Sequence, residues 1–552
     1  MTAERPRNVI TALEDAAGTG LGFSFRGEGD PVELRYGDLL ERARERAGAL
    51  AAWGVEPGDT VGILGPNAPE WVEWAFASWA RGATVVPIPF GMRIADLGEY
   101  VARLQRLVAA AGCRVVMADA RFLPAFPEGM ARAWDGPVPT LDPSAAVELR
   151  SQDAAVLQFT SGTTSEPKMA ELAHGRVLAC VDSFLEAFRM RPDDVSLSWL
   201  PLFHDNGLFG HMIGPVVARV PGWLIRTERF ARNPAGWFTE IAEAGATMTS
   251  GPCSAWAIAL KAALRGSERY DLSRLRMGIF GAEAIEPAAL DGYGEHAAEL
   301  GLAPGTLVGA YGLAEATLLV TVGAPGEGMR FDLVDSTALA ERGEAVPVSE
   351  GTGPARRIAS CGRPSPIFRV RIVGPDGALP DRRVGEIQVS GPGLMTGYRG
   401  LAPEEQPFTE DGWLRTGDAG YLAEGELYVT GRIKDLIIVL GRNYAPEEFE
   451  WEAQQVPGVR AGRCVAFAAD GEGEGRAIVV FEPAPGIDPE ETAAAVRRRV
   501  ATTLGVAVGE VLPVAKGTVM KTTSGKLQRA ALREAYARGE VARLDAGADP
   551  GS

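Results

Sequence analysis

The chain has 552 residues, 46% hydrophobic and 23% charged, and its 55 basic and 72 acidic residues give a net charge of −17. This length predicts two to four domains, one with an extensive core. The acidic balance argues against non-specific binding to nucleic acid or anionic membranes. No stretch of about 18 apolar residues occurs, and residues 1–8 lack a secretory apolar region, so we expect a cytoplasmic protein without a membrane span.

Strands and helices alternate in the first half of the chain, which predicts an α/β fold with largely buried strands. The expected strands are residues 60–64, 84–89, 115–118, 154–159 and 277–280, and residues 69–81 form an amphipathic helix. From about 368 to 429 the pattern changes to strands and turns, with strands at 369–373, 385–390 and 427–430 and a Pro-Asp-Gly turn at 375–377. This pattern of strands and turns predicts a β-rich subdomain.

After residue 431 the chain becomes a smaller α+β mixture, with an extended segment at 436–440 and helices at 446–455 and 489–504. We therefore expect residues 1–431 to form a large N-terminal unit of two α/β subdomains plus the β-rich subdomain. Residues 432–540 form a small C-terminal domain, and residues 541–552 a disordered tail.

Lysine placement gives the first chemical indication. Only six basic residues are lysines, and Lys168, Lys434, Lys521 and Lys526 lie in three short Gly- or Thr/Ser-rich stretches. Lysine is a compact point charge on a flexible stem, so this placement indicates phosphate chemistry. Compositional bias in an arginine-rich chain is the alternative.

Residues 160–168, reading TSGTTSEPK, follow the strand at 154–159 and precede a helical segment at 175–188. Small hydroxyl residues and a glycine let backbone and side-chain donors close on phosphate oxygens, and lysine adds charge. The Walker pattern of a P-loop is absent from this stretch. A solvated Thr/Ser linker is the alternative reading.

Further short motifs follow in a fixed order. They are LPLFHD at 200–205, GAE at 281–283, YGLAE at 311–315, TGD at 416–418, GRIKD at 431–435 and KTTSGK at 521–526. Each is weak alone. Together, from about residue 12 to 538, they resemble the adenylate-forming superfamily of acyl-CoA synthetases, peptide synthetase adenylation domains and luciferases.

Within that superfamily the chain is most similar to the fatty acyl-AMP ligases. The similarity lies in YGLAEATL at 311–318, a long polar insertion at about 324–355, SCGRP at 360–364 and KDLIIVLGRN at 434–443. In that family the insertion is thought to stiffen the arrangement of the two domains and to disfavour transfer to coenzyme A.

The resemblance implies ATP- and Mg²⁺-dependent activation of a small carboxylic acid, release of pyrophosphate, and transfer to an acyl carrier protein supplied in trans. Lys526 would be the central catalytic cation, with His204 near the acyl carboxylate, Glu315 and Thr164 holding Mg²⁺, and Lys434 as the hinge of a mobile C-terminal domain. Nucleotide-binding residues would be Thr160, Ser161, Gly162, Thr163, Thr164, Lys168, Gly281, Ala282, Glu283, Ala310, Tyr311, Gly312, Asp418 and Arg432, with Asp418 on the ribose hydroxyls. The substrate pocket would include Trp199, Asn206, Gly251, Cys253 and Trp256.

Three residues depart from the family pattern. Ser165 and Met169 replace glycines, which predicts a less mobile pyrophosphate loop. Asn206 replaces an apolar residue, and an unpaired buried amide disfavours a plain alkyl chain, which favours a polar, short or aromatic acid. The alternatives are an acyl- or aryl-CoA synthetase, an adenylating enzyme for an unusual small acid, and a non-catalytic nucleotide-binding homologue. The sequence leaves both monomer and homodimer open.

Overall fold

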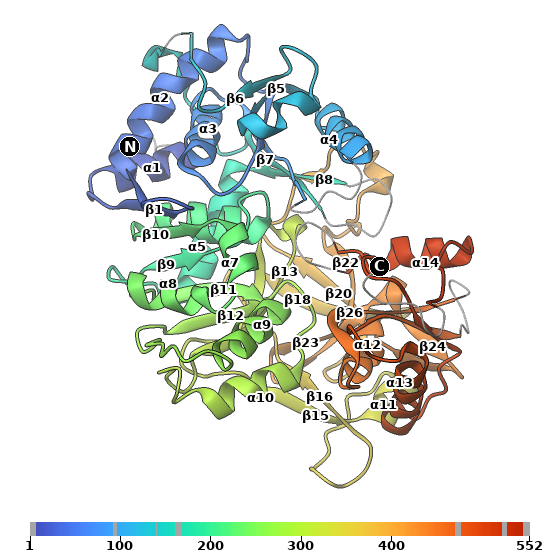
Figure 1. Ribbon diagram of the computed structural model, residues 1–552. Helices are drawn as coiled ribbons and strands as arrows, with labels where there is room; N and C mark the ends of the chain where they lie inside the picture. The colour runs from blue at the N-terminus through green and yellow to red at the C-terminus, as the bar shows by residue number, and fades with distance from the viewer. Residues whose placement is uncertain are drawn as a thin grey trace.

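The largest layer is a nine-stranded sheet in the middle of the molecule (Figure 1). The computed structural model describes residues 7–91, 97–139, 141–160, 168–469, 476–521 and 527–544. The sheet order is β17-β14-β13-β12-β11-β9-β10-β1-β2, and the six strands from β13 to β1 run parallel. The strands are β1 (Gly22–Arg26), β2 (Val32–Arg35), β9 (Ser196–Ser198), β10 (Gly222–Ile225), β11 (Met248–Pro252), β12 (Met277–Gly281), β13 (Leu307–Gly312), β14 (Leu319–Val322) and β17 (Arg363–Pro364).

A seven-stranded sheet lies above it in Figure 1, in the order β21-β8-β7-β4-β3-β5-β6. Its strands are β3 (Thr60–Leu64), β4 (Thr84–Pro87), β5 (Cys113–Ala118), β6 (Ala131–Ala133), β7 (Ala154–Phe159), β8 (Met169–Ala173) and β21 (Gly397–Tyr398). All five residues of β3 are buried, as expected for a central parallel strand covered on both faces. The strand β5 starts at Cys113, earlier than predicted, because Cys113 pairs with Thr60.

Helices cover both sheets of the N-terminal unit. The helix α3 begins with Pro69 in its first turn, where a missing backbone N–H costs nothing, and buries three tryptophans. The helix α5 contacts β7 and β8 of one sheet and β14 of the other, so it joins the two layers. The helices are α1 (Val9–Ala17), α2 (Tyr36–Ala52), α3 (Pro69–Ala80), α4 (Leu97–Ala110), α5 (His174–Ala187), α6 (Gly214–Ala218), α7 (Thr227–Arg232), α8 (Gly236–Ala244), α9 (Cys253–Ala263) and α10 (Pro287–His296).

The expected β-rich region is an antiparallel five-stranded sheet in the order β19-β18-β20-β22-β23. Its strands are β18 (Arg369–Gly374), β19 (Gly377–Ala378), β20 (Gly385–Ser390), β22 (Leu414–Ala423) and β23 (Glu426–Arg432). The last strand is longer than predicted because its pairing with β22 continues to Arg432, opposite Asp418.

The C-terminal part follows, at the right of Figure 1. Its elements are β24 (Ile437–Val439), β25 (Arg442–Tyr444), α12 (Pro446–Gln454), β26 (Val459–Ala468), β27 (Ala477–Pro483), α13 (Pro489–Leu504), β28 (Glu510–Pro513) and α14 (Arg529–Ala537). The helix α13 has the predicted bounds because Asp488 caps its first turn and Gly505, at φ +67°, ends it. The domain boundary near residue 431 stays a prediction.

Residues 541–544 belong to the segment that we expected to be a disordered tail. They are held by an Arg543–Glu490 ion pair of 2.7 Å and by a hydrogen bond from Leu544 N to Pro513 O. Residues 545–552 of that predicted tail lie outside the described residues.

The polar insertion is partly ordered structure. The strands β15 (Phe331–Asp335) and β16 (Ala355–Ala359) pair as an antiparallel ribbon, with α11 (Ser336–Arg342) following β15. Ala340 packs into the core of the C-terminal part, Glu341 pairs with Arg442 at 2.6 Å, and Arg356 pairs with Glu448 at 2.8 Å. The insertion therefore connects the N-terminal unit to the C-terminal part.

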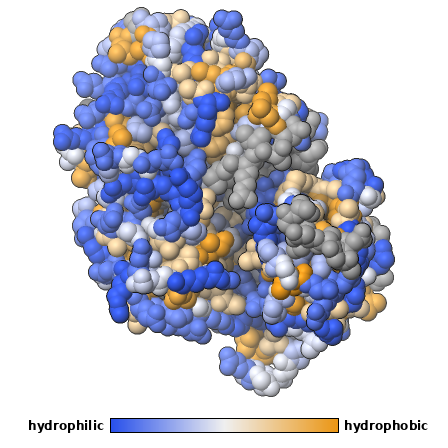
Figure 2. Space-filling model, in the orientation of Figure 1, coloured by the Kyte–Doolittle hydropathy of each residue, from blue (hydrophilic) through white to orange (hydrophobic). Residues whose placement is uncertain are grey.

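Polar side chains dominate the face of the molecule that Figure 2 shows. Figure 2 shows hydrophilic side chains over most of one face, with small apolar areas scattered between them. Among the described residues, no helix is both long and apolar enough to cross a bilayer.

Candidate nucleotide and acid site

The predicted motifs meet at one edge of the nine-stranded sheet. The strands β9, β11, β12 and β13 are parallel neighbours, so the segments that follow their carboxyl ends lie at the same edge. In open α/β sheets, ligands bind at this edge. It carries Trp199, Cys253, the Gly281–Ala282–Glu283 motif and the Tyr311–Gly312 motif.

Two backbone features shape this edge. Ala282 has φ +65°, a left-handed conformation that a non-glycine residue rarely adopts. A Cβ placed on Gly312 would come within 1.8 Å of Leu318 O, so only glycine allows the tight return of the chain after β13. Ala310, the other predicted residue here, is buried in the same strand.

Asp418 is the centre of a polar cluster at the predicted ribose position. Its Oδ2 accepts a hydrogen bond from the Tyr311 hydroxyl at 2.7 Å, and its Oδ1 accepts one from Arg432 Nε at 2.9 Å. Its own N–H donates to the Thr416 hydroxyl, which in turn donates to Ile387 O. Asp418 raises the pKa of Arg432, while burial and then Asp418 raise the pKa of Tyr311. A fixed carboxylate beside a cation is suited to hold a hydroxylated, anionic ligand.

Glu315 lies in a second cluster. Its Oε1 accepts a 2.5 Å hydrogen bond from the Tyr398 hydroxyl, and Lys168 Nζ lies 4.9 Å from the centre of the Tyr398 ring. Burial and then Glu315 raise the pKa of this tyrosine. Tyr398 was missed from the sequence, because only the pairing of β21 with β8 brings it beside residues 168 and 315.

The Glu315 carboxylate fits the predicted Mg²⁺. Its Oε2 has no partner among the described residues, and hard carboxylate oxygens suit Mg²⁺, which commonly takes one or two carboxylates together with phosphate oxygens. No group of three or more His, Cys, Asp or Glu side chains with metal-binding geometry occurs in the described ranges.

The two described residues at the ends of the predicted phosphate loop, Thr160 and Lys168, are hydrogen-bonded to each other. Thr160 N donates to Lys168 O at 2.9 Å where β7 and β8 form a hairpin. Met169 belongs to β8, pairs with Phe159 and is buried against the core. Ser161, Gly162, Thr163, Thr164 and Ser165 lie outside the described residues, so the predicted restriction of this loop stays a prediction.

His204 and Asn206 lie at the start of a short π-helix, η3 (Asn206–Ile213). His204 Nδ1 is 2.6 Å from Asp205 Oδ1, and Asn206 Oδ1 accepts a hydrogen bond from Ser250 of β11 at 3.1 Å. Single π-helical turns are rare and often occur at functional sites. The contact places Asn206 against the sheet edge that carries the other motifs.

The remaining predicted pocket residues lie on the other side of β11. A Cβ on Gly251 would face the rings of Trp237, Trp256 and Trp199 at 3.2 to 3.7 Å. Trp199 stacks on Phe230, and its indole N–H is buried without a hydrogen-bond partner among the described residues. Because neighbouring strand residues point to opposite faces, Ser250 faces Asn206 whereas Gly251 faces this aromatic cluster. Cys253 is buried at the start of α9.

Lys521 belongs to the C-terminal motif region. Burial lowers the pKa of Lys521, and the carboxylate of Glu283 opposes this shift. Glu283 also accepts a hydrogen bond from Ser254 N. Lys521 and Leu527 form an isolated antiparallel β-bridge. These two residues flank the segment that holds Lys526, and Lys526 itself lies outside the described residues. Lys434 is exposed in a short turn after β23.

One largely buried arginine of the C-terminal motif region, 13% exposed, was missed from the sequence. Arg529 donates to Glu450 at 2.9 Å and to Glu447 at 3.0 Å, and lies 3.6 Å from Asp435, the neighbour of Lys434. It therefore connects the start of α14 to α12 and to the predicted hinge. The sequence motifs did not indicate these contacts, because the partners of Arg529 lie far from it in the sequence.

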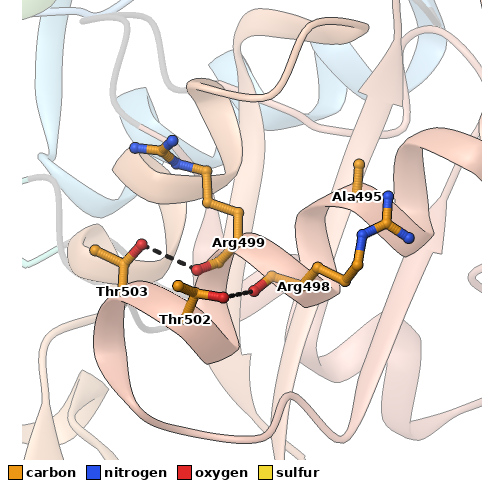
Figure 3. A pocket seen from close by; sticks show the side chains of 5 residues that line it. All are labelled: Ala495, Arg498, Arg499, Thr502 and Thr503. Atoms are coloured by element: carbon orange, nitrogen blue, oxygen red, sulfur yellow. Dashed lines mark hydrogen bonds between the residues drawn. The ribbon is translucent and has the colours of Figure 1, made fainter.

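A surface hollow lies elsewhere, on the helix α13. It has a volume of about 320 Å³ and is lined by Ala495, Arg498, Arg499, Thr502 and Thr503 of α13 (Figure 3). The two threonine hydroxyls donate to backbone oxygens of their own helix, and the two arginines point apart. This shallow surface on one helix is separate from the nucleotide and acid site.

The fold and site place the chain in a known class. Residues 21–399 match the family model of the AMP-binding enzymes, which covers more than half of the chain. The protein belongs to the AMP-binding enzyme family, as the motifs predicted.

More specific similarities follow within this family. The chain is 30% identical to JamA of Moorena producens, a medium-chain-fatty-acid–[acyl-carrier-protein] ligase, over 95% of this chain and 93% of that protein. A solved structure from work on the fatty acyl-adenylate ligases of E. coli and L. pneumophila has a TM-score of 0.87 and 30% identity, and covers 98% of both chains. A multidomain structure of a keto acid-selecting peptide synthetase module has a TM-score of 0.87 and 27% identity, and covers 98% of this chain and 46% of that one.

Proposed function

We propose that this protein uses ATP to convert a carboxylic acid into an acyl-adenylate, and then transfers the acyl group to the phosphopantetheine thiol of an acyl carrier protein supplied in trans. In the first step a carboxylate oxygen attacks the α-phosphorus and pyrophosphate leaves. In the second, the thiolate attacks the acyl carbonyl carbon and AMP leaves. Family membership and the similarity to JamA support this reaction class.

The observation that carries the proposal is the meeting of two clusters at one sheet edge. Asp418 with Arg432 and Tyr311 offers acceptors and a cation for a nucleoside phosphate. Glu315 binds the Tyr398 hydroxyl and Lys168 lies over the Tyr398 ring, so the two residues offer a carboxylate and a cation. Attack of one anion on another requires such fixed charges, because they stabilise the charge that develops in the transition state.

We further propose Mg²⁺ as the metal, held by Glu315 and Thr164. When bound, it would neutralise charge on the phosphate oxygens. Arg432 and Lys168 would orient the nucleotide, and Asp418 would accept hydrogen bonds from the ribose hydroxyls.

The insertion supports a carrier protein, in preference to coenzyme A, as acceptor. Its contacts through Ala340, Glu341 and Arg356 connect the two parts of the molecule. Such contacts stabilise one relative arrangement of the two parts and oppose a change to another, which is the role thought to disfavour coenzyme A in the fatty acyl-AMP ligases.

The test has two stages. ATP–pyrophosphate exchange is measured with Mg²⁺ and a panel of fatty, hydroxy, keto and aromatic acids, since JamA acts on fatty acids and the peptide synthetase neighbour on keto acids. An accepted acid is then offered with coenzyme A or with a phosphopantetheinylated carrier protein. We expect exchange with at least one acid class and thioester formation on the carrier. Absence of exchange across the panel would refute adenylation, and efficient thioester formation with coenzyme A alone would identify an acyl-CoA synthetase.

The role of Lys526 gives a sharper test. We expect Lys526→Ala to lower adenylation by about 100-fold or more, because a cation aimed at developing charge is lost, and to leave transfer from a supplied acyl-adenylate nearly unchanged. Lys516→Ala is the matched control, because Lys516 is an exposed lysine of the same C-terminal part. Equal loss of both half-reactions in Lys526→Ala would contradict the assigned role.

A further inference from the structure

Four polar side chains form a continuous hydrogen-bonded chain beneath the predicted acid site. The Ser196 hydroxyl is 2.8 Å from His211 Nδ1, His211 Nε2 is 2.6 Å from the Ser250 hydroxyl, and Ser250 donates to Asn206 Oδ1 at 3.1 Å. Ser196, His211 and Ser250 are each 2% exposed, so water does not compete for these bonds. A buried network of this kind is costly unless every member is satisfied.

The chain has a direction. The Ser250 hydroxyl donates its hydrogen to Asn206 Oδ1, so in its contact with His211 it must accept a hydrogen from Nε2. With Nε2 protonated, His211 Nδ1 is the acceptor for the Ser196 hydroxyl. This arrangement requires a neutral imidazole, and burial lowers the pKa of His211 to about 4. In this arrangement the oxygen of the Asn206 amide points toward the sheet and its NH₂ group points away from it.

The packing around Asn206 leaves room for its side-chain amide. A Cβ on Gly210 would lie 2.8 Å from Asn206 Oδ1 and 3.2 Å from Leu318, so a glycine in this helical turn makes room for the amide. Glycine inside a helix costs about 1 kcal/mol relative to alanine, so close approach of the amide is a physical reason for its presence. Asn206 Nδ2 has no hydrogen-bond partner among the described residues.

We propose that Asn206 Nδ2 donates a hydrogen bond to an oxygen on the acyl group, so that the preferred substrates are small acids with an acceptor oxygen close to the carboxylate, such as 2-oxo and 2-hydroxy acids. This inference rests on the proposed adenylation. The backbone N–H of Asn206 donates to His204 Nδ1 at 3.4 Å, so the two residues share one turn of the chain, and His204 is the residue assigned to the acid's carboxylate. We therefore expect the oxygen that Asn206 binds to be close to that carboxylate.

The same amide disfavours a plain alkanoate. An alkyl chain that covers Asn206 removes water from the NH₂ group and offers no acceptor, which leaves a buried donor unpaired. A site built to hydrogen-bond a substrate oxygen discriminates strongly against the analogue that lacks it. In this proposal Asn206 determines specificity, and Ser250 and His211 are positioning residues.

The experiment compares the kcat/KM values of ATP–pyrophosphate exchange for matched 2-oxo, 2-hydroxy and plain alkanoic acids at short and medium chain length. We expect the wild-type protein to prefer the oxygenated acids by about 10- to 100-fold. Asn206→Leu should reduce this ratio to about one, because an apolar side chain no longer penalises the alkyl chain. Ser250→Ala should lower the ratio to an intermediate value, because the amide is no longer held in one orientation.

The ratio separates specificity from damage to the fold. Misfolding lowers exchange with both acids together and leaves their ratio unchanged, and Asn233→Leu at an exposed asparagine is the matched control. A wild-type ratio near one, or an unchanged ratio in Asn206→Leu, would overturn the inference while adenylation itself stands. Exchange with none of these acids, nor with the wider panel, would overturn the proposed function and this inference with it.

Discussion

Asp418 shows how single residues at this site are held before any ligand binds. Tyr311, Arg432 and the Thr416 hydroxyl fix both carboxylate oxygens and the backbone. The side chain is 8% exposed, so its charge is poorly hydrated and depends on Arg432. Fixed, partly dehydrated groups of this kind recognise ligands well because little reorganisation is needed.

At this residue we expect Asp418→Asn to raise the KM for ATP by about 10- to 100-fold, because a hydrogen bond to a charged group is lost. Steady-state kinetics with saturating acid would measure it. Asp411→Asn is the control, since Asp411 also binds an arginine, Arg371, at 2.7 Å, but in an exposed position of the β-rich sheet. An unchanged KM for ATP in Asp418→Asn would remove this residue from the nucleotide site.

At the scale of elements, short pairings bring distant motifs together. The two-residue strand β21 pairs with β8 and thereby places Tyr398 beside Glu315 and Lys168. The ribbon of β15 and β16, together with α11, brings the N-terminal unit into contact with the C-terminal part. In both cases a few backbone hydrogen bonds bring together side chains from distant segments of the chain.

The helix α14 is attached through one arginine, which gives a prediction for this element. Arg529→Met should destabilise the C-terminal part by about 3–5 kcal/mol, because Glu450, 4% exposed, would lose its cation and remain buried. Urea unfolding and hydrogen exchange of residues 446–468 would measure the effect. Arg533→Met on the same helix is the control and should change stability by less than about 1 kcal/mol. Equal effects would show that Arg529 is not the principal attachment.

At the scale of the whole molecule, the two large sheets share one core, which the helix α5 joins. Two buried histidines lie in this region. His174, 1% exposed, accepts a hydrogen bond from Val9 N, and His211 belongs to the network beneath Asn206. Burial lowers the pKa of both from 6.5 to about 4. The folded molecule thus keeps both rings neutral at pH values where an unfolded chain protonates them.

Stability should therefore fall in mild acid. Above pH 6.5 both rings are neutral in the folded and unfolded states, so they add no pH dependence. As the pH falls from about 6.5 to about 4, the unfolded chain binds protons that the folded one excludes. The free energy of unfolding drops by on the order of 3 kcal/mol for each histidine. Urea titrations across this range would show it. His174→Asn should reduce the slope and His296→Asn should not, and an unchanged slope in His174→Asn would contradict the assignment.

The sequence by itself determined the α/β class, several element bounds and the family. Residues 60–64, 154–159, 385–390 and 489–504 have the predicted bounds, because apolar periodicity, turns and caps are local properties of the chain. The ordered motifs predicted a set of nucleotide-binding residues, and the structure brings three of them, Tyr311, Asp418 and Arg432, into contact. Phosphate chemistry needs particular residue types at short spacing, and a sequence displays this directly.

Only the tertiary structure decided which distant side chains meet. The pairing of Tyr398 with Glu315, the attachment of Arg529 to Glu450, and the chain from Ser196 through His211 and Ser250 to Asn206 join segments with no shared local pattern. It also separated the predicted pocket residues, with Asn206 on one side of β11 and Trp199 and Trp256 on the other. Strand register and packing set these contacts, because they depend on how whole elements align.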